Sequence, residues 1–170
     1  MVRETNKNVR EDAPSGLNGM RPLGSGHLGN LLRDPYLLMN ERVQAALAEG
    51  GFADLTFAHT QMATHISDEG SRITELAQRS QLTKPSVVYL VDELQRLGYV
   101  ERVPDPTDKR AKLVRPTARG LEAQELGRSA VRSIEREWRK LLGKKRMKAL
   151  QAGLRDLHAA LWPAPDSSEA

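Results

Sequence analysis

Residues 83–120 read TKPSVVYLVDELQRLGYVERVPDPTDKRAKLVRPTARG, and this stretch predicts a capped helix followed by a β-hairpin. Thr83 is suited to cap the helix, Pro85 falls in its first turn where no N–H is needed, and Gly98 is suited to end it. The apolar residues that recur at helical spacing are Val87, Leu90, Val91, Leu94 and Leu97. We therefore expect this stripe to be buried and the polar first turn to lie on the outer side.

The hairpin that follows carries most of the local charge. Two short β-type runs, 99–104 and 110–116, flank the turn DPTDK at 105–109. Pro104 and Pro116 should confine the strands to an exposed ribbon, because proline cannot donate to a ladder. Residues 99–120 contain six basic and three acidic side chains. A hairpin tip buries little, so this charge favours a polyanion as partner, with a merely solvated basic face as the alternative.

Helical segments surround this central stretch on both sides. Apolar periodicity predicts one helix from about Leu28 to the Gly50-Gly51 pair, with Asp34-Pro35 acting as a cap or a kink. A second helix should start near Leu55-Thr56, and a short third, ITELAQRS, has Thr74 as its candidate N-cap. Thr117 should start a long helix, and a last helix should cover 144–162 before a proline breaks it. The order of elements is that of a winged helix-turn-helix.

Composition excludes several classes of protein. The chain of 170 residues has no Cys, which excludes disulfides, cysteine-based zinc sites and thiol redox sensing. It has no apolar run long enough to span a membrane and no apolar signal segment near its start, so the expected location is the cytoplasm. No Gly-rich phosphate loop or nucleophile elbow is present, so we expect no enzyme and no cofactor. His59 and His65 are six residues apart, which is not the spacing of a helical metal pair, and no metal site is predicted.

A winged helix-turn-helix with a cationic hairpin is suited to DNA. The major groove admits one α-helix, and a helix held by its buried stripe can present first-turn side chains to base edges. A hairpin with a cationic tip can reach the minor groove, where arginine is attracted by the negative potential. We expect Asp108 to hold Arg110 or Lys109 in a fixed rotamer through a charge-assisted hydrogen bond.

The segments LTFAHTQMATHI (55–66) and ITELAQRS through TARG (73–120), with their flanking helices, resemble the MarR-type regulators of multiple antibiotic resistance. The resemblance covers roughly residues 28–162 and implies a mainly α fold with a small β-hairpin wing. It implies a helical dimerisation region at 27–52 and 117–162 and a DNA-binding lobe at 53–116. The segments outside it, 1–26 and 163–170, are expected to be disordered tails, and the first of them has turn-forming residues, mixed charge and no periodicity. The resemblance also implies a homodimer bound to a palindromic operator on double-stranded DNA, usually as a repressor that a small molecule can release.

The resemblance also carries residue roles onto matching positions. In the capped helix and the wing, the positions where the family contacts DNA are Thr83, Lys84, Pro85, Ser86, Val88, Tyr89, Asp108, Lys109 and Arg110. Tyr89 stands where the family often has Arg, and Val88 where it often has a small hydroxyl residue, so base preference does not transfer from relatives. The resemblance suggests Tyr36, His59 and Trp138 as the lining of an effector pocket, whereas core packing would explain them equally well. The alternative function is a winged-helix module that binds protein without sequence-specific DNA recognition.

Overall fold

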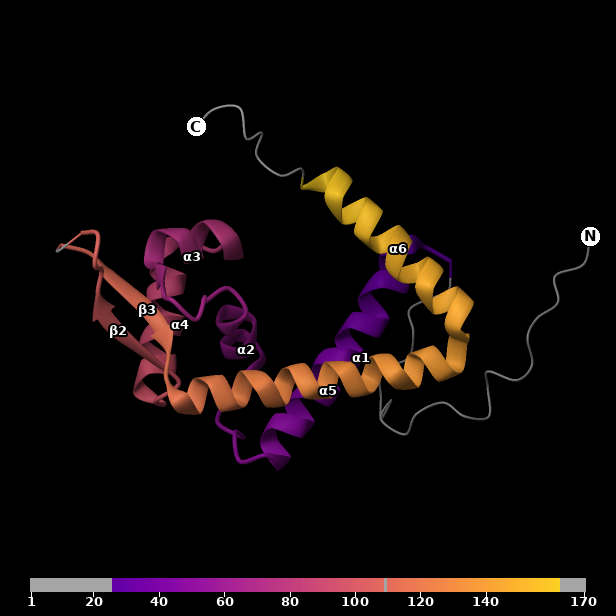
Figure 1. Ribbon diagram of the computed structural model, residues 1–170, viewed down its shortest axis with the longest axis horizontal. Helices are drawn as coiled ribbons and strands as arrows, with labels where there is room; N and C mark the ends of the chain where they lie inside the picture. The colour runs from indigo at the N-terminus through magenta and orange to yellow at the C-terminus, as the bar shows by residue number, and fades with distance from the viewer. Residues whose placement is uncertain (1–25, 109, 163–170) are drawn as a thin grey trace, which may run out of the picture. The chain divides into compact units, whose positions relative to one another are not determined.

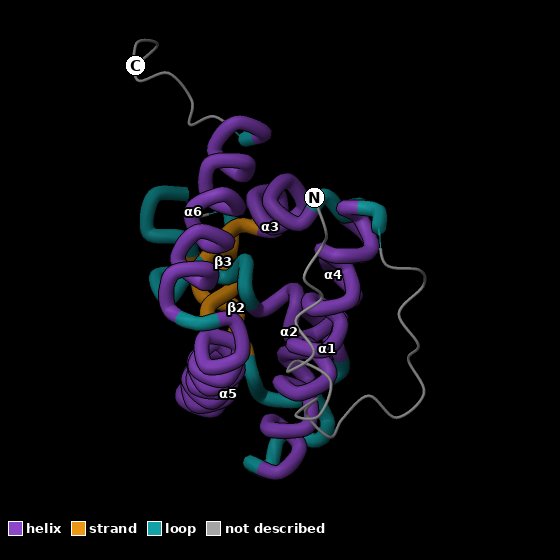
Figure 2. The backbone as a smooth tube through the Cα atoms, turned by 90° about the vertical axis from the view of Figure 1, so that its right-hand side faces the viewer, coloured by secondary structure: helices purple, strands orange, loops and turns teal. Residues whose placement is uncertain are grey.

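The computed structural model describes residues 26–108 and 110–162. These residues fall into two compact units, 26–131 and 132–162, and each is described by itself. The predicted tails lie outside the described residues except for Gly26, and so does Lys109. Figure 2 shows that helices dominate both units and that the strands are few and short.

The unit 26–131 contains the whole winged helix-turn-helix. Its helices are α1 (Leu28–Glu49), α2 (Phe57–Ala63), α3 (Ile73–Ser80), α4 (Lys84–Arg96) and the first half of α5 (Ala118–Leu142). Its strands are β1 (Ser71–Arg72), β2 (Val100–Pro104) and β3 (Lys112–Pro116), of which Figure 1 labels β2 and β3. The expected fold class, mainly α with a small β wing, is confirmed. Thr83 caps α4, accepting a hydrogen bond from the backbone N–H of Ser86 at 3.4 Å, as the sequence predicts.

One apolar core holds this unit together and fixes α4 in place. The predicted stripe of α4 is confirmed, because Val87, Val91 and Leu94 are buried while Leu90 and Leu97 are partly buried against the same cluster. The other members of the core come from α1, α2, α3, the wing strands and α5: Leu47, Leu55, Met62, Ile66, Leu76, Tyr99, Val100, Val114 and Ala123. Burial of one face leaves the opposite face of α4 available to solvent.

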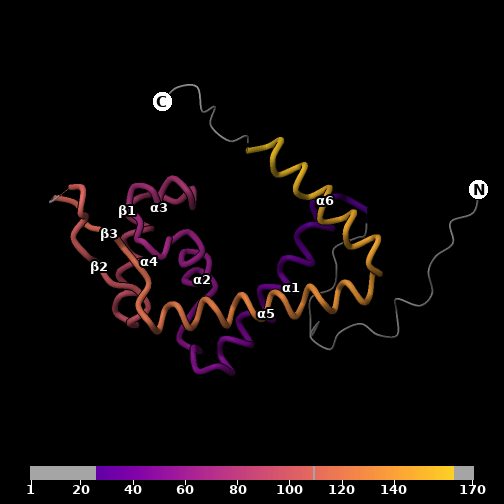
Figure 3. Tube along the Cα trace, in the orientation of Figure 1, coloured from indigo at the N-terminus to yellow at the C-terminus, as the bar shows by residue number. Residues whose placement is uncertain are grey.

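The wing has three strands where the sequence predicted a two-stranded ribbon. The strand order is β1-β3-β2, both pairings are antiparallel, and β3 therefore lies in the centre (Figure 3). The short β1 pairs through Ser71 with Val114 and through Arg72 with Leu113. It is only two residues long, which is too short for an alternating pattern to reveal. Gly70, at φ +104°, lies so close to β3 that a Cβ atom there would be 2.9 Å from the Cβ of Leu113.

Two predicted details of the helices differ in the structure. The N-cap of α3 is Arg72 and not Thr74, and the backbone N–H of Arg72 donates to the carboxylate of Glu75 at 3.2 Å. The chain passes directly from β1 into α3, so the last residue of the strand becomes the cap. Pro35 lies inside α1, which continues from Leu28 to Glu49 without an interruption.

The unit 132–162 consists of the second half of α5 and of α6 (Lys144–Leu161), joined by Gly143 at φ +80°. Ile134 and Met147 are its buried apolar side chains among the described residues. An apolar stripe of α6 with spacings of four, three and four remains exposed: Leu150, Leu154, Leu157 and Leu161. No helix in the described ranges is both long enough and apolar enough to cross a membrane.

Candidate nucleic-acid interface

The first two turns of α4 project a small, mostly polar set of side chains into solvent. Thr83, Lys84, Pro85 and Ser86 are all exposed, and the Thr83 and Ser86 hydroxyl oxygens lie 2.8 Å apart. That contact fixes the two hydroxyls on the surface of the cap while each keeps further hydrogen-bonding capacity. The cap therefore presents a rigid, preorganised set of polar groups.

The second turn adds two larger side chains. Tyr89 is 65% exposed and Val88 is half-buried. Most of the Tyr89 side chain therefore faces solvent, where a partner can reach it. The face of α4 opposite its buried stripe thus combines one ammonium group, hydroxyls and limited apolar surface.

The tip of the wing is a tight loop between β2 and β3. The backbone N–H of Asp105 donates to the carbonyl of Ala111 at 3.1 Å, and the N–H of Ala111 donates to the carbonyl of Asp108 at 2.9 Å. The carboxylate of Asp108 accepts a hydrogen bond from the backbone N–H of Arg110 at 3.0 Å. The sequence predicted that Asp108 would hold the Arg110 or Lys109 side chain. Among the described residues Asp108 instead shapes the backbone, which leaves the Arg110 side chain exposed.

Most arginines of the lobe form ion pairs within the chain. Arg72 pairs with Asp105, Arg102 with Asp92 at 2.7 Å, and the other pairs are Arg79–Glu75, Arg96–Glu93, Arg115–Glu101 and Arg119–Asp54. In the sequence alone, each of Arg72, Arg79, Arg96 and Arg102 could be a phosphate contact or a solubilising group. The structure shows a third use, because the fold pairs each of them with a carboxylate.

Three basic side chains of this region differ from these arginines in their pairing. Within the described part of residues 53–119, the cations that form no ion pair are Lys84, Arg110 and Lys112. All three are exposed, one in the first turn of α4 and two on the wing. No acid among the described residues pairs with these charges, which lie on the two elements that a winged helix-turn-helix presents to DNA.

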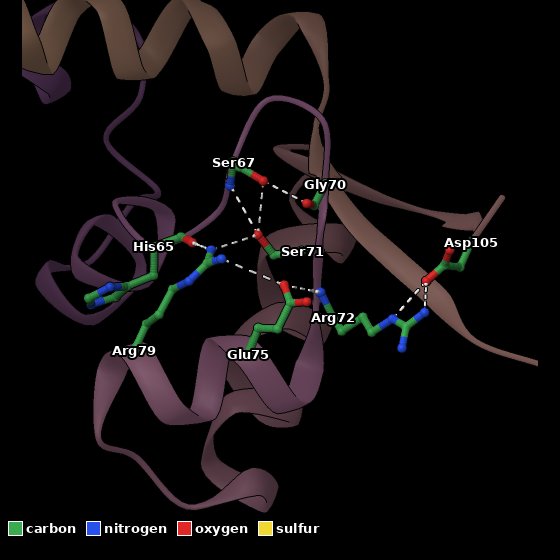
Figure 4. A network of polar contacts seen from close by, with 8 residues as sticks. All are labelled: His65, Ser67, Gly70, Ser71, Arg72, Glu75, Arg79 and Asp105. Atoms are coloured by element: carbon green, nitrogen blue, oxygen red, sulfur yellow. Dashed lines mark hydrogen bonds and ion pairs between the residues drawn. The ribbon is translucent and has the colours of Figure 1, made fainter. Parts of the chain in front are cut away.

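The base of the wing is fixed by a network that sequence reasoning missed (Figure 4). The Nε of Arg72 donates to Oδ2 of Asp105 at 2.7 Å, and Asp105 is only 4% exposed. Its other oxygen, Oδ1, accepts from the hydroxyl of Thr107 at 2.7 Å and from the backbone N–H of Thr107 at 2.8 Å. Hydrogen bonds from Thr107, with a further contribution from Arg72, lower the pKa of Asp105 to about 2.

A sequence signal for part of this network exists. An Asp followed two residues later by Thr, at the start of a Pro-containing turn, is typical of a side chain that bonds its own backbone. The partner, Arg72, is 33 residues away and could not be assigned from spacing.

The candidate effector residues lie in different units. The hydroxyl of Tyr36 donates to Gln61 at 3.1 Å. His59 is buried and completes the cap of α2, because its Nδ1 accepts from the N–H of Thr56 while its own N–H donates to the Thr56 hydroxyl, both at 3.3 Å. Trp138 is half-buried in the unit 132–162. The effector assignment therefore stays a prediction. Among the described residues no group of three or more His, Asp or Glu side chains is arranged to hold a metal ion.

Comparison with known proteins finds a family and solved structures that this arrangement resembles. Residues 53–111 match a model described as the MarR family. Transcriptional regulator Tm0710 from Thermotoga maritima is similar at 25% identity over 78% of this chain and 92% of its own, with a TM-score of 0.56. Apo wild-type MarR from E. coli is similar at 23% identity over 79% of this chain and 98% of its own, with a TM-score of 0.62.

A third relative, MepR from S. aureus, is similar in two complexes. A mutant bound to an oligodeoxyribonucleotide shows 22% identity over 81% of this chain and 99% of its own, with a TM-score of 0.53. MepR bound to ethidium bromide shows 21% identity over 81% and 98%, with a TM-score of 0.56. No curated protein sequence matched the chain. The match over residues 53–111 and the shared fold show that this chain is similar to the MarR family of transcription regulators and has the winged helix-turn-helix fold.

Proposed function

We propose that this regulator binds double-stranded DNA in a sequence-specific manner, with α4 in the major groove and the wing against the adjacent backbone and minor groove. The observation that carries the proposal is the position of the unpaired cations. Lys84, Arg110 and Lys112 lie on α4 and the wing, while the other described basic side chains of the lobe are paired with acids. Phosphate contacts would give these charges a partner.

Individual roles follow from exposure and chemistry. Lys84 and Ser86, in the exposed first turn, are assigned to base edges together with Pro85, and Thr83 and Tyr89 to the backbone. Val88 suits the methyl group of thymine better than a hydrogen-bonding edge. On the wing, Arg110 is assigned to the minor groove and Lys109 to phosphate, while Asp108 holds the tip by its bond to the Arg110 N–H.

The proposed active form is a homodimer. The exposed stripe of α6 has the one-sided apolar pattern of a helix that packs against another surface. In the unit 26–131, α1 also leaves apolar side chains exposed: Leu28, Leu31, Leu32 and Tyr36. A second copy of the chain would cover such surfaces, and a two-fold dimer would place two α4 helices in successive major grooves about 34–36 Å apart. The matching site is a palindrome.

Regulation is proposed to be repression that a small molecule relieves. A dimer bound over a promoter would exclude the polymerase, and a ligand releases it only if it binds the DNA-free conformation more tightly. The ethidium-bound form of MepR supports a small-molecule partner for a protein of this fold. Tyr36, His59 and Trp138 are the proposed contacts.

Selection of genomic DNA fragments by the purified full-length chain tests the proposal. We expect a narrow set of fragments sharing a two-fold-related sequence, and nuclease footprints with two protected segments one helical turn apart. The winged-helix protein-interaction module makes the opposite prediction, which is weak retention that does not depend on the fragment. Uniform retention across random fragments would therefore refute sequence-specific binding.

A further inference from the structure

We infer that Arg72 and Asp105 are positioning residues for DNA binding, which hold the tip of the wing so that Arg110 meets the duplex in a fixed place. The inference rests on the proposed function and adds to it two residues that do not themselves contact DNA. We call the contact between these residues, together with Thr107, the wing latch. Hydrogen bonds connect each of the three residues to the other two.

The wing latch uses nearly every polar atom that its members offer. The Nε and Nη2 atoms of Arg72 both reach Oδ2 of Asp105, at 2.7 and 2.5 Å, and Nη2 also donates to the hydroxyl of Thr107 at 3.3 Å. Oδ1 of Asp105 accepts the two hydrogen bonds from Thr107. A buried carboxylate satisfied on both oxygens has one favourable orientation, so the backbone that carries it is held as well.

The position of Asp105 makes this contact decisive for the tip. Asp105 directly follows the last residue of β2, and its N–H and carbonyl bond Ala111 and Asp108, the residues on either side of the segment that carries Arg110. A tip anchored at its first residue loses little freedom when it binds. A released tip would have to be ordered by the DNA, and that ordering reduces affinity.

The other end of the latch is fixed in the helix-turn-helix. Arg72 is paired with Leu113 in the sheet, and its N–H bonds Glu75 at the start of α3. Arg79 continues the network from the next turn of α3, with Nη1 donating to the hydroxyl of Ser71 and to the carbonyl of His65, each at 3.2 Å (Figure 4). The wing tip is thereby connected to the body of the lobe by charge-assisted bonds, in addition to the sheet.

A competing role for Arg72 is direct contact with a phosphate, since its side chain is 38% exposed. Replacing Arg72 by lysine should affect the two roles differently. A phosphate contact needs a positive charge, which Lys supplies, whereas the latch needs two guanidinium nitrogens on one carboxylate oxygen and a third contact to Thr107. Arg72→Lys therefore separates the two roles without removing charge.

The experiment is a double-mutant cycle in affinity for the fragment that the wild type selects. The variants are Arg72→Lys, Asp105→Asn, Arg110→Ala and the double variant Arg72→Lys/Arg110→Ala, with Arg96→Lys as the matched control in an exposed ion pair of the same lobe. We expect Arg72→Lys and Asp105→Asn each to weaken binding roughly tenfold and Arg96→Lys to leave it unchanged. In the Arg110→Ala background, Arg72→Lys should weaken binding less than about twofold, because the residue it positions is gone.

A role in folding alone would not produce this coupling with Arg110, and circular dichroism checks that each variant is folded. If Asp105→Asn does not fold, Thr107→Val replaces it, since Thr107 bonds both members of the pair. Full affinity in Arg72→Lys, or additive losses in the double variant, overturns the inference while the proposed function stands. Unchanged affinity in Arg110→Ala overturns the proposed function and the inference with it.

Discussion

The backbone carbonyl oxygen of Tyr99 lies 2.1 Å from the point that a Cβ atom on Gly120 would occupy. The same carbonyl accepts a hydrogen bond from the N–H of Thr117 at 3.0 Å, and the hydroxyl of Thr117 accepts from the N–H of Gly120 at 3.1 Å. The first turn of α5 is thus packed directly against the backbone at the start of β2. The Thr117-x-x-Gly120 pattern has a physical cause, because Thr caps the helix and Gly permits the approach.

Gly120→Ala should therefore lower the free energy of unfolding by about 2 kcal/mol, since the added methyl group meets backbone that cannot move aside easily. Urea unfolding measures the change. Gly127→Ala is the matched control on the same helix, where a Cβ would lie 3.9 Å from Val43 in ordinary contact. The free energy of unfolding of Gly127→Ala should rise by about 0.5–1 kcal/mol, because alanine has a higher helix propensity than glycine. Equal effects of the two substitutions would show that the contact with Tyr99 is not what requires glycine.

Acid should remove part of the stability through Asp105. Its pKa is about 2 in the folded protein against 3.8 ordinarily, so between these values the unfolded chain binds more protons and acidification favours unfolding. This contribution is present above about pH 5 and is lost as the pH falls from about 4 through 2. Wild type should therefore lose stability more steeply than Asp105→Asn across that interval, with similar curves above it. Parallel curves from urea unfolding below pH 4 would contradict the low pKa.

The first turn of α4 should read sequence, whereas the wing should supply affinity that depends little on sequence. Lys84→Ala should relax preference at one base position of each half-site, at a loss of about 1–3 kcal/mol there. Selection from a randomised site, repeated with the variant, measures this change. Lys112→Ala is the matched control, because a lysine on the wing strand should contact phosphate, and its loss should weaken all sites alike. An unchanged base preference in Lys84→Ala would show that Lys84 contacts the DNA backbone and not a base edge.

The exposed stripe of α6 should be a dimer surface. Leu154→Glu places a charge in the middle of that stripe and should shift the protein toward the monomer, because an unpaired charge is costly to bury between chains. Arg155→Gln, one residue away on the same helix and outside the stripe, should leave the assembly intact. Sedimentation equilibrium gives the result, and a dimer of full stability in Leu154→Glu would exclude α6 from the interface.

The elements best predicted from sequence are those whose causes are local. The boundaries of α4 depend on Thr83, Pro85 and Gly98, which lie within or beside it, and its buried stripe follows from spacing alone. The strand β1 escaped prediction because a two-residue strand depends on its partner and has no pattern of its own. The prediction of Thr74 as the N-cap of α3 was wrong for the same reason, because α3 begins where the strand β1 ends.

The sequence predicted where the residues of the candidate site lie, but only partly which contacts they make. The resemblance and the charge pattern led to Lys84 and Arg110, which the fold leaves exposed and unpaired within the described residues. For Arg72, Arg96 and Arg102 the sequence does not distinguish a phosphate contact from a solubilising group, because pairing with an acid such as Asp105 or Asp92 depends on tertiary structure. Apolar periodicity likewise predicts that one face of α6 packs against another surface, but it does not identify that surface.

The most direct test of the central claim, that DNA is held by the cations which the fold leaves unpaired, is the salt dependence of binding. Affinity for the selected fragment should be measured over a range of salt concentrations for wild type, Arg110→Ala and Arg96→Ala. A cation in the minor groove lies between the two phosphate backbones, and each phosphate charge that is neutralised contributes about 0.9 to the slope of log affinity against log salt. Arg110→Ala should therefore flatten the slope by about one per half-site. Arg96, whose charge is already paired with Glu93, should leave the slope unchanged when it is replaced. Equal slopes for wild type and Arg110→Ala, or an equal loss in both variants, would contradict the claim.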